Sequence, residues 1–188
     1  MITEPLDAWI INRRWIGDTS AIVTLFTREQ GIINASYRGG RTPKKQANLQ
    51  VFTPSWVVLN KRHDWCYLQQ IEATAAMLPL NGHHLFAGLY LNELLYHALK
   101  PCDPHPCLYE TYETTLHGLS KLPEKLLLEA MLRCFELQFL TSCGYEVSYE
   151  FDDVNVLKAA KHIMRAAIDH ALDGKAIKAR ALYKSIAN

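Results

Sequence analysis

The residues best suited to chemistry in this sequence are a dense group of cations. The stretch from Gln30 to His63 contains six Lys and Arg residues and no Asp or Glu. A surface that carries one sign of charge attracts a ligand of the opposite sign, so a polyanion such as nucleic acid is the natural partner. The alternative is a solvated basic loop that binds nothing, and charge alone leaves both open.

Fourteen residues are the candidate contacts to nucleic acid. In the first part of the chain they are Arg13, Arg14, Arg28, Tyr37, Arg38, Arg41, Lys44, Lys45, Lys61 and Arg62. Near the C-terminus they are Lys161, Arg165, Lys178 and Arg180. Lys158, Lys161 and Arg165 follow at spacings of three and four, which places them on one helical face that could extend a DNA path or meet an acidic peptide.

Aromatic residues lie among these cations. Grooves that bind single strands combine cations, which follow the phosphates, with rings on which bases stack. The candidate rings are Trp15, Tyr37, Trp56 and Trp65. Each of them could instead fill the core of a barrel, and Gly39 and Gly40 could bend the backbone toward a ligand or simply form a flexible turn.

Arg133 lies in an otherwise apolar stretch, where a charge must reach water or find a partner. One interpretation is an internal ion pair with Glu129 or Glu136. The other is a partner-binding site, in which Arg133, together with Leu137, captures the carboxylate of a peptide beside an apolar groove.

Metal and catalytic chemistry find little support. Two thiols and one imidazole fall within residues 102–107, but zinc usually takes four ligands and no second pair is nearby in the sequence. A Cys–His nucleophile would need an orienting acid, and none is evident. Walker loops, dinucleotide fingerprints and nucleophile elbows are absent. We therefore expect no enzyme, no metal and no cofactor.

Composition and charge set the frame for these residues. The chain has 188 residues, of which 49% are hydrophobic and 21% charged, so it is not a disordered protein. Its apolar runs are too short for a membrane helix, its acidic N-terminus does not resemble a secretory signal, and its five cysteines do not form an even framework. A reduced, cytoplasmic setting without membrane contact is expected. Net charge is +3 over residues 1–78, −7 over 79–153 and +5 over 154–188, which predicts separate electrostatic roles.

The pattern predicts an α+β fold in which an OB-type antiparallel β-barrel precedes an all-helical domain. β-branched and aromatic residues alternate in five short runs separated by turn residues. These runs are Ala8–Trp15, Ser20–Thr27, Ile32–Tyr37, Leu49–Leu59 and Trp65–Ile71. From His84 the period becomes helical, with further helices predicted over Leu108–Leu119, Glu124–Ser142, Val156–Leu172 and Ile177–Ile186. The predicted domains are 1–79, which would bind nucleic acid, and 80–188.

Several stretches, in order along almost the whole chain, resemble one family. They are Ile11–Trp15 with Asp18–Ser20, Leu25–Gly31, Tyr37–Arg41, Leu49–Pro54, Gly88–Leu95, Leu132–Leu137, Cys143–Tyr145, Leu157–Lys161, Gly174–Lys175 and Lys178–Arg180. This ordered set is similar to the bacterial DNA repair protein RecO family.

The resemblance implies an N-terminal OB fold, a helical C-terminal domain and a non-catalytic role in recombinational repair. Such proteins bind single- and double-stranded DNA, anneal complementary strands and help the recombinase RecA replace single-strand-binding protein. The implied partners are RecR and the C-terminal tail of single-strand-binding protein, and the implied location is the cytoplasm, at the nucleoid. The alternative function is a protein-interaction adaptor whose OB-like module has no direct DNA role.

One region departs from the family pattern. Members often carry an insert, in some cases with a cysteine zinc site, after the segment that matches Tyr145. Here residues 146–153 run almost directly into the last long helix, with no cysteine beyond Cys143. We expect this insert to be short or missing after about residue 150.

Overall fold

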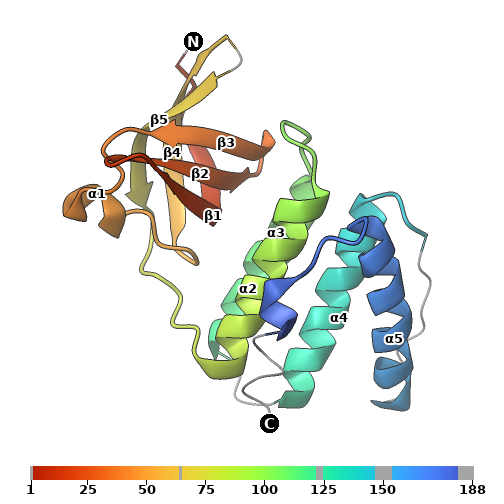
Figure 1. Ribbon diagram of the computed structural model, residues 1–188. Helices are drawn as coiled ribbons and strands as arrows, with labels where there is room; N and C mark the ends of the chain where they lie inside the picture. The colour runs from red at the N-terminus through yellow and green to blue at the C-terminus, as the bar shows by residue number, and fades with distance from the viewer. Residues whose placement is uncertain (1, 64, 122–124, 147–153, 182–188) are drawn as a thin grey trace. The chain divides into compact units, whose positions relative to one another are not determined.

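The computed structural model describes residues 2–63, 65–121, 125–146 and 154–181. Its chain divides into two compact units (Figure 1). The barrel unit comprises residues 1–78 and 99–106, and the helical unit comprises residues 79–98 and 107–188.

Five strands of the barrel unit close into one barrel in the order β1-β2-β3-β5-β4. The strands are β1 (Leu6–Ile16), β2 (Ser20–Thr27), β3 (Gly31–Tyr37), β4 (Pro54–Arg62) and β5 (Trp65–Ala73). The pairs β1–β2, β2–β3, β4–β5 and β1–β4 are antiparallel, and a parallel pairing of β3 with β5 through Ser36 and Tyr67 completes the ring. Closure removes the open sheet edges that would otherwise invite aggregation.

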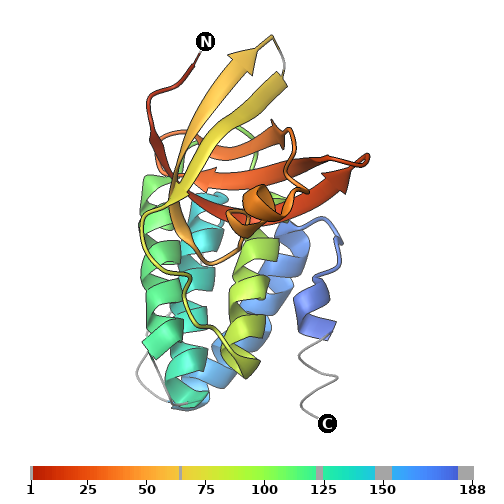
Figure 2. The same cartoon turned by 90° about the vertical axis from the view of Figure 1, so that its left-hand side faces the viewer.

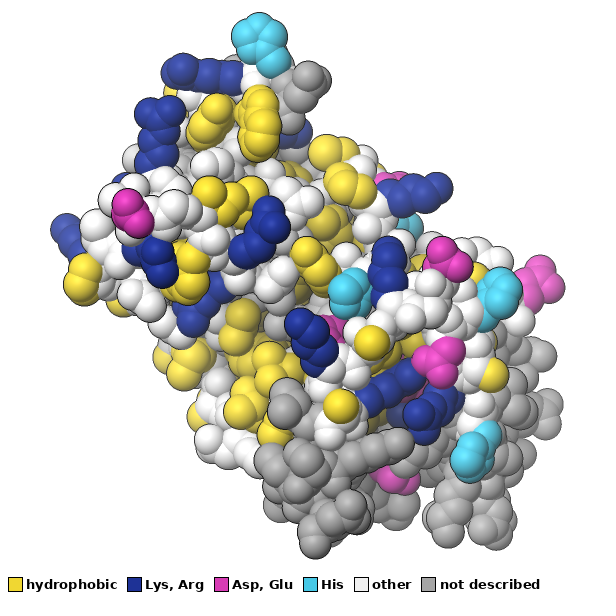
Figure 3. Space-filling model, in the orientation of Figure 1, with side chains coloured by type: hydrophobic (Ala, Val, Ile, Leu, Met, Phe, Trp, Pro, Cys, Tyr) yellow, Lys and Arg dark blue, Asp and Glu magenta, His cyan; other side chains and the backbone are white. Residues whose placement is uncertain are grey.

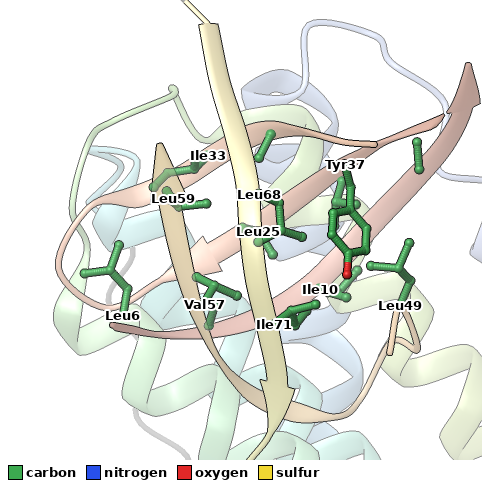
Figure 4. Packing of buried hydrophobic residues seen from close by; sticks show 14 residues of the cluster. Leu6, Ile10, Leu25, Ile33, Tyr37, Leu49, Val57, Leu59, Leu68 and Ile71 are labelled. Atoms are coloured by element: carbon green, nitrogen blue, oxygen red, sulfur yellow. The ribbon is translucent and has the colours of Figure 1, made fainter. Parts of the chain in front are cut away.

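Inward-facing side chains fill this barrel because residues alternate between its two faces. Fourteen buried residues form the core, among them Leu25, Val57 and Leu68 (Figure 4). Along β5, Leu68 and Ile71 belong to this core. Beyond the bulge in the β4–β5 hairpin, Trp65 alternates with Cys66 and Leu68, which pack on and in the core, and therefore lies on the outer face of the barrel.

The β4–β5 hairpin continues beyond the rest of the barrel, as Figure 2 shows. Register runs from Ser55 opposite Ala73 to Arg62 opposite Trp65, with a bulge between Val58 and Leu59. A bulge bends and twists the strand that contains it. The hairpin therefore forms a projecting arm, called the β4–β5 arm, with side chains on its outer face.

Between β3 and β4 the structure has a short helix that the sequence analysis did not predict. This helix, α1, spans Pro43–Ala47, with extended Thr42 before it and proline at its first turn, where a missing N–H costs nothing. The strand predicted to start at Leu49 starts at Pro54 instead. Leu49 is nevertheless fully buried in the barrel core, so its apolar character reflects packing and not strand structure.

Residues 99–106, which connect α2 to α3, cluster with the barrel. Pro101 forms a bridge with Ile32, and the Cys102 amide donates a hydrogen bond to the Ile32 carbonyl at 2.9 Å. Gly31 makes this approach possible, since it has φ +65° and a Cβ there would lie 2.0 Å from the Asp103 carbonyl oxygen.

The helical unit is built mainly from four long helices. They are α2 (Gly82–Ala98), α3 (Pro106–Lys121), α4 (Lys125–Ser142) and α5 (Val154–Ala171). The rings of Tyr112, Phe135 and Phe139 form part of its core, with successive ring centroids 6.4 Å apart. A further helical turn covers residues 178–181, and the rest of the helix predicted over Ile177–Ile186 lies outside the described residues. A barrel followed by helices confirms the predicted fold class.

Candidate nucleic-acid interface

A polar groove on the outer face of the barrel brings together cations from three different segments. It is lined by Ser36, Arg38, Lys45, Asn60, Arg62, Tyr67, Leu68 and Gln69. Arg38 follows β3, Lys45 belongs to α1, and Arg62 ends β4. Cations that are up to 24 positions apart in the sequence thus share one surface.

Local contacts hold two of these cations in place without neutralising them. Lys45 Nζ donates to the Arg38 carbonyl oxygen at 2.8 Å and lies 4.7 Å from the centroid of the Tyr37 ring. The Arg38 guanidinium lies 5.9 Å from the centroid of the Tyr67 ring. Both ring distances fall within the range of cation–π attraction, which orients a cation but leaves its charge in place.

A second pair of cations flanks Trp15. The guanidinium carbons of Arg13 and Arg41 lie 5.5 and 5.7 Å from the Trp15 ring centroid. Arg13 donates to the Leu49 carbonyl at 2.6 Å, and Arg41 donates to the Gly17 carbonyl at 2.7 Å. The β1–β2 turn and the segment after β3 are therefore fastened to each other by the side chains that also supply the charge.

Gly40 lets the segment after β3 pass close to the barrel wall. A Cβ at this position would lie 3.2 Å from both the Ala21 Cβ and the Tyr37 ring, which is tighter than ordinary packing. The Arg41 amide then donates to the Thr19 carbonyl at 3.1 Å. A side chain at residue 40 would displace the segment that positions Arg38 and Arg41.

The described carboxylates leave the charge of this surface uncompensated. Across residues 2–63 and 65–121, no ion pair joins Arg38, Lys45 or Arg62 to an acidic side chain. Figure 3 shows Lys and Arg side chains gathered over the barrel unit, with few acidic side chains on this face. Such a surface has a net positive potential available to a ligand.

The remaining cationic candidates of the barrel lie on its surface and do not line the groove. Arg14, Arg28 and Lys44 are exposed. Lys61 is exposed as well, and its Nζ donates to the Gln30 side-chain oxygen at 2.6 Å. The structure assigns none of these four to the groove.

Tyr37 requires a correction, because its ring belongs to the barrel core. It is 5% exposed and lies beside Ile10 and Leu49 (Figure 4). Burial also raises the pKa of its phenol. A ring in this place cannot stack on a base, so its role is to pack the core and to support Lys45.

The outer face of the β4–β5 arm carries two other rings. Trp65, a candidate from the sequence, is 63% exposed, whereas Trp15 and Trp56 are half-buried. Tyr67, which is also half-buried and lines the groove, was missed. Alternation with Cys66 and Leu68, which pack on and in the core, was the signal that places Tyr67 on the outer face.

The cations of the helical unit have acidic and polar partners. Arg180 Nη1 lies 2.5 Å from the Asp169 carboxylate, and Arg180 Nη2 donates to the Tyr90 hydroxyl at 3.2 Å. Arg165 lies 4.0 Å from the same Asp169. Lys178 is exposed, and the side chain of Lys161 is outside the described residues. Arg165 and Arg180, predicted to contact DNA, are thus engaged with a carboxylate.

The structure also corrects the prediction that Arg133 binds a peptide carboxylate. It is 7% exposed, and its Nη2 donates to Glu136 Oε1 at 2.8 Å. The same oxygen accepts a hydrogen bond from the buried Tyr90 hydroxyl at 2.6 Å, and burial beside Glu136 raises the Tyr90 pKa. A guanidinium enclosed in this way cannot receive a peptide carboxylate, so the internal ion pair is the better interpretation. Leu137, its proposed neighbour in the peptide site, is half-buried.

Within the described ranges, no three or more His, Cys, Asp and Glu side chains gather as a metal site. His105 instead lies 3.6 Å from the Asp103 carboxylate. None of the described helices has both the length and the apolar character to cross a membrane.

The chain is similar to known proteins over most of its length. The family model described as recombination protein O N terminal matches residues 1–77, and the model described as recombination protein O C terminal matches residues 80–155. A DNA repair protein RecO of Legionella pneumophila (strain Corby) is 42% identical over 226 residues, which cover 97% of this chain and 99% of the relative. The RecO protein of Methylococcus capsulatus is 31% identical over 225 residues, covering 95% of this chain and 92% of the relative.

These two alignments are longer than the chain itself, which has 188 residues. Both relatives therefore contain residues that have no counterpart here. The RecO protein of Pseudoalteromonas atlantica is 36% identical over a shorter stretch of 154 residues, covering 81% of this chain and 63% of the relative. The location of the missing residues, expected after about residue 150, stays a prediction.

Proposed function

Because this chain belongs to the RecO family of DNA repair proteins, we propose that it binds DNA through the groove on its barrel and anneals complementary strands without catalysis. The observation that supports this most directly is a set of cations that line one groove and have no ion pair with a carboxylate in the described part of the chain, namely Arg38, Lys45 and Arg62. A groove of this kind follows a phosphate backbone.

Annealing follows from charge screening. Two complementary strands repel each other through their phosphates, so their bases meet rarely. A strand lying along Arg38 and Arg62 has part of its charge neutralised, and Arg13 and Arg41 beside Trp15 offer a second cationic surface on the same unit. Screening lowers the repulsion, and base pairing supplies the free energy of the reaction.

The proposed setting is single-stranded DNA coated with single-strand-binding protein. In this proposal the chain displaces that protein, works with RecR and helps to load RecA, as its resemblance to the family implies. The acidic tail of single-strand-binding protein remains a proposed partner, but Arg133 does not receive it, since that side chain is buried with Glu136. The exposed Lys178 is a cation that the tail could meet on the helical unit.

A fluorescence annealing assay tests the proposal. Strands carrying a donor and an acceptor dye are coated with single-strand-binding protein, and the rate of pairing is measured with the wild type and with Arg38→Glu/Arg62→Glu. We expect the double variant to lose most of the acceleration. Lys121→Glu changes an exposed lysine at the end of α3 and is the control, with a rate near that of the wild type.

The adaptor function predicts a different result in the same experiment. If the barrel only docks a protein partner, Arg38→Glu/Arg62→Glu anneals DNA as the wild type does. Failure of the wild type to bind any DNA at low salt would likewise contradict a direct DNA role.

A further inference from the structure

The outer face of the β4–β5 arm carries two aromatic rings two residues apart. Trp65 and Tyr67 are alternate residues of β5, and the residues that follow each of them, Cys66 and Leu68, pack on and in the core. Side chains at positions i and i+2 of a strand stand on the same face. Trp65 is 63% exposed, although large apolar side chains gain free energy by being buried.

The spacing of these rings matches that of an inserted base. Strand residues advance about 3.3–3.4 Å each, so side chains two residues apart are separated by about 6.7 Å. Bases stacked along a DNA strand lie about 3.4 Å apart, and one base between two rings therefore needs a separation of about 6.8 Å. Two aromatic residues at this interval on one strand face can enclose a single planar ring.

Cations lie close to both rings. Arg62 is the cross-strand partner of Trp65, and Asn60 is the partner of Tyr67. The Arg38 guanidinium lies 5.9 Å from the Tyr67 ring centroid, and Arg38, Arg62 and Tyr67 line the same groove. Stacking and phosphate contact are thus available to one nucleotide at once.

Resting on the DNA-binding function proposed above, we propose that Trp65 and Tyr67 hold one unpaired base between their rings and so make the groove selective for single-stranded DNA. In a duplex the bases are already paired and stacked, and extracting one costs free energy. An unpaired base has both faces available. The cations alone bind either form of DNA, and the two rings supply the preference.

Binding to three probes tests this proposal. The probes are a single-stranded oligothymidylate, an abasic strand of the same length with the same number of phosphates, and a blunt duplex, each followed by fluorescence anisotropy at one salt concentration. Trp65→Ala should weaken binding of the oligothymidylate by about fivefold to 150-fold, which corresponds to one stacked base. Its affinity for the abasic strand and for the duplex should stay within about twofold of wild type.

Two further variants sharpen the result. Trp65→Phe keeps a ring and should restore most of the binding, whereas Trp65→Leu keeps apolar bulk without a ring and should behave as Trp65→Ala does. The losses of oligothymidylate affinity caused by Trp65→Ala and by Tyr67→Ala should also be non-additive, because removal of either ring opens the enclosure that both rings form. Circular dichroism melts check that each variant is folded.

The outcomes separate this proposal from the one on which it rests. Equal losses on all three probes, or no loss on the oligothymidylate, would overturn the base-stacking role while leaving the cationic groove intact. Arg38→Glu/Arg62→Glu should weaken all three probes together. If wild-type protein binds none of them at low salt, both proposals fail.

Discussion

The cations of the barrel unit and those of the helical unit have different neighbours. Arg38 and Lys45 are oriented by aromatic rings, and Lys45 also by a backbone carbonyl, so their charge is not cancelled. Arg180 and Arg165 share the Asp169 carboxylate, and Arg133 is buried with Glu136. In Figure 3 acidic and basic side chains lie interspersed over the helical unit, in contrast to the barrel unit.

This difference teaches that a count of charges does not identify a binding surface. Residues 154–188 have a net charge of +5, higher than the +3 of residues 1–78. Yet the described cations of that segment include two that are engaged with Asp169. What matters is whether the folded chain leaves a cation without an acid, and by that criterion the barrel is the unit that we propose to bind DNA.

The largest effect should come from substitution of Arg133. This substitution tests whether the cations of the helical unit stabilise the fold. Removing one partner of a buried ion pair leaves the other charge buried and unpaired, which destabilises the fold by about 3–5 kcal/mol. Arg133→Met should lower the free energy of unfolding in urea by about that amount, because Glu136 stays buried. Cys134→Ser, at an exposed position of the same helix, is the control and should change stability little. A stable Arg133→Met protein that binds DNA poorly would reverse our assignment.

The next effect compares charge reversal in the two units directly. Arg38→Glu/Arg62→Glu should weaken binding of single-stranded DNA by about 30- to 100-fold at low salt, because two attractions become repulsions. Arg165→Glu/Lys178→Glu makes the same change of net charge on the helical unit and should cost less than about threefold. Similar losses in both variants, measured by fluorescence anisotropy, would remove the distinction between the units.

The smallest effect should follow from releasing a compensated cation. Asp169→Asn frees Arg165 and Arg180 from a carboxylate, so DNA affinity at low salt should rise by about twofold. The free energy of unfolding should fall by about 1 kcal/mol or less, as for an exposed ion pair. An unchanged DNA affinity would show that Asp169 is not what keeps these arginines from binding DNA.

Much of the fold could be predicted, because strands and helices have different hydrophobic periods. The predicted bounds of α3, α4 and α5 lie within two residues of the observed ones, and the predicted start of α2 at His84 lies two residues after its observed start. Helix α1 was missed, since five residues with no buried side chain leave no periodic pattern. The apolar Leu49 then suggested a strand that starts five residues too early.

The candidate site was harder to predict, because it depends on faces and partners. In β3, Tyr37 shares the apolar face of Ile33 and Ala35, and this alternation indicated a core residue. In β5 the same reasoning indicates an outward Tyr67, which we overlooked. The pairing of Arg133 with Glu136 was one of two interpretations that the sequence left open, and only the burial of both side chains decides between them.

The dependence of DNA affinity on salt tests the central claim most directly. Each phosphate contact releases counterions, so the logarithm of the binding constant falls linearly with the logarithm of salt concentration, and each lost contact reduces the slope by about one. We predict a slope smaller by about two for Arg38→Gln/Arg62→Gln and an unchanged slope for Arg165→Gln/Lys178→Gln. A wild-type slope in the barrel variant, or an equal reduction in both, would contradict the account.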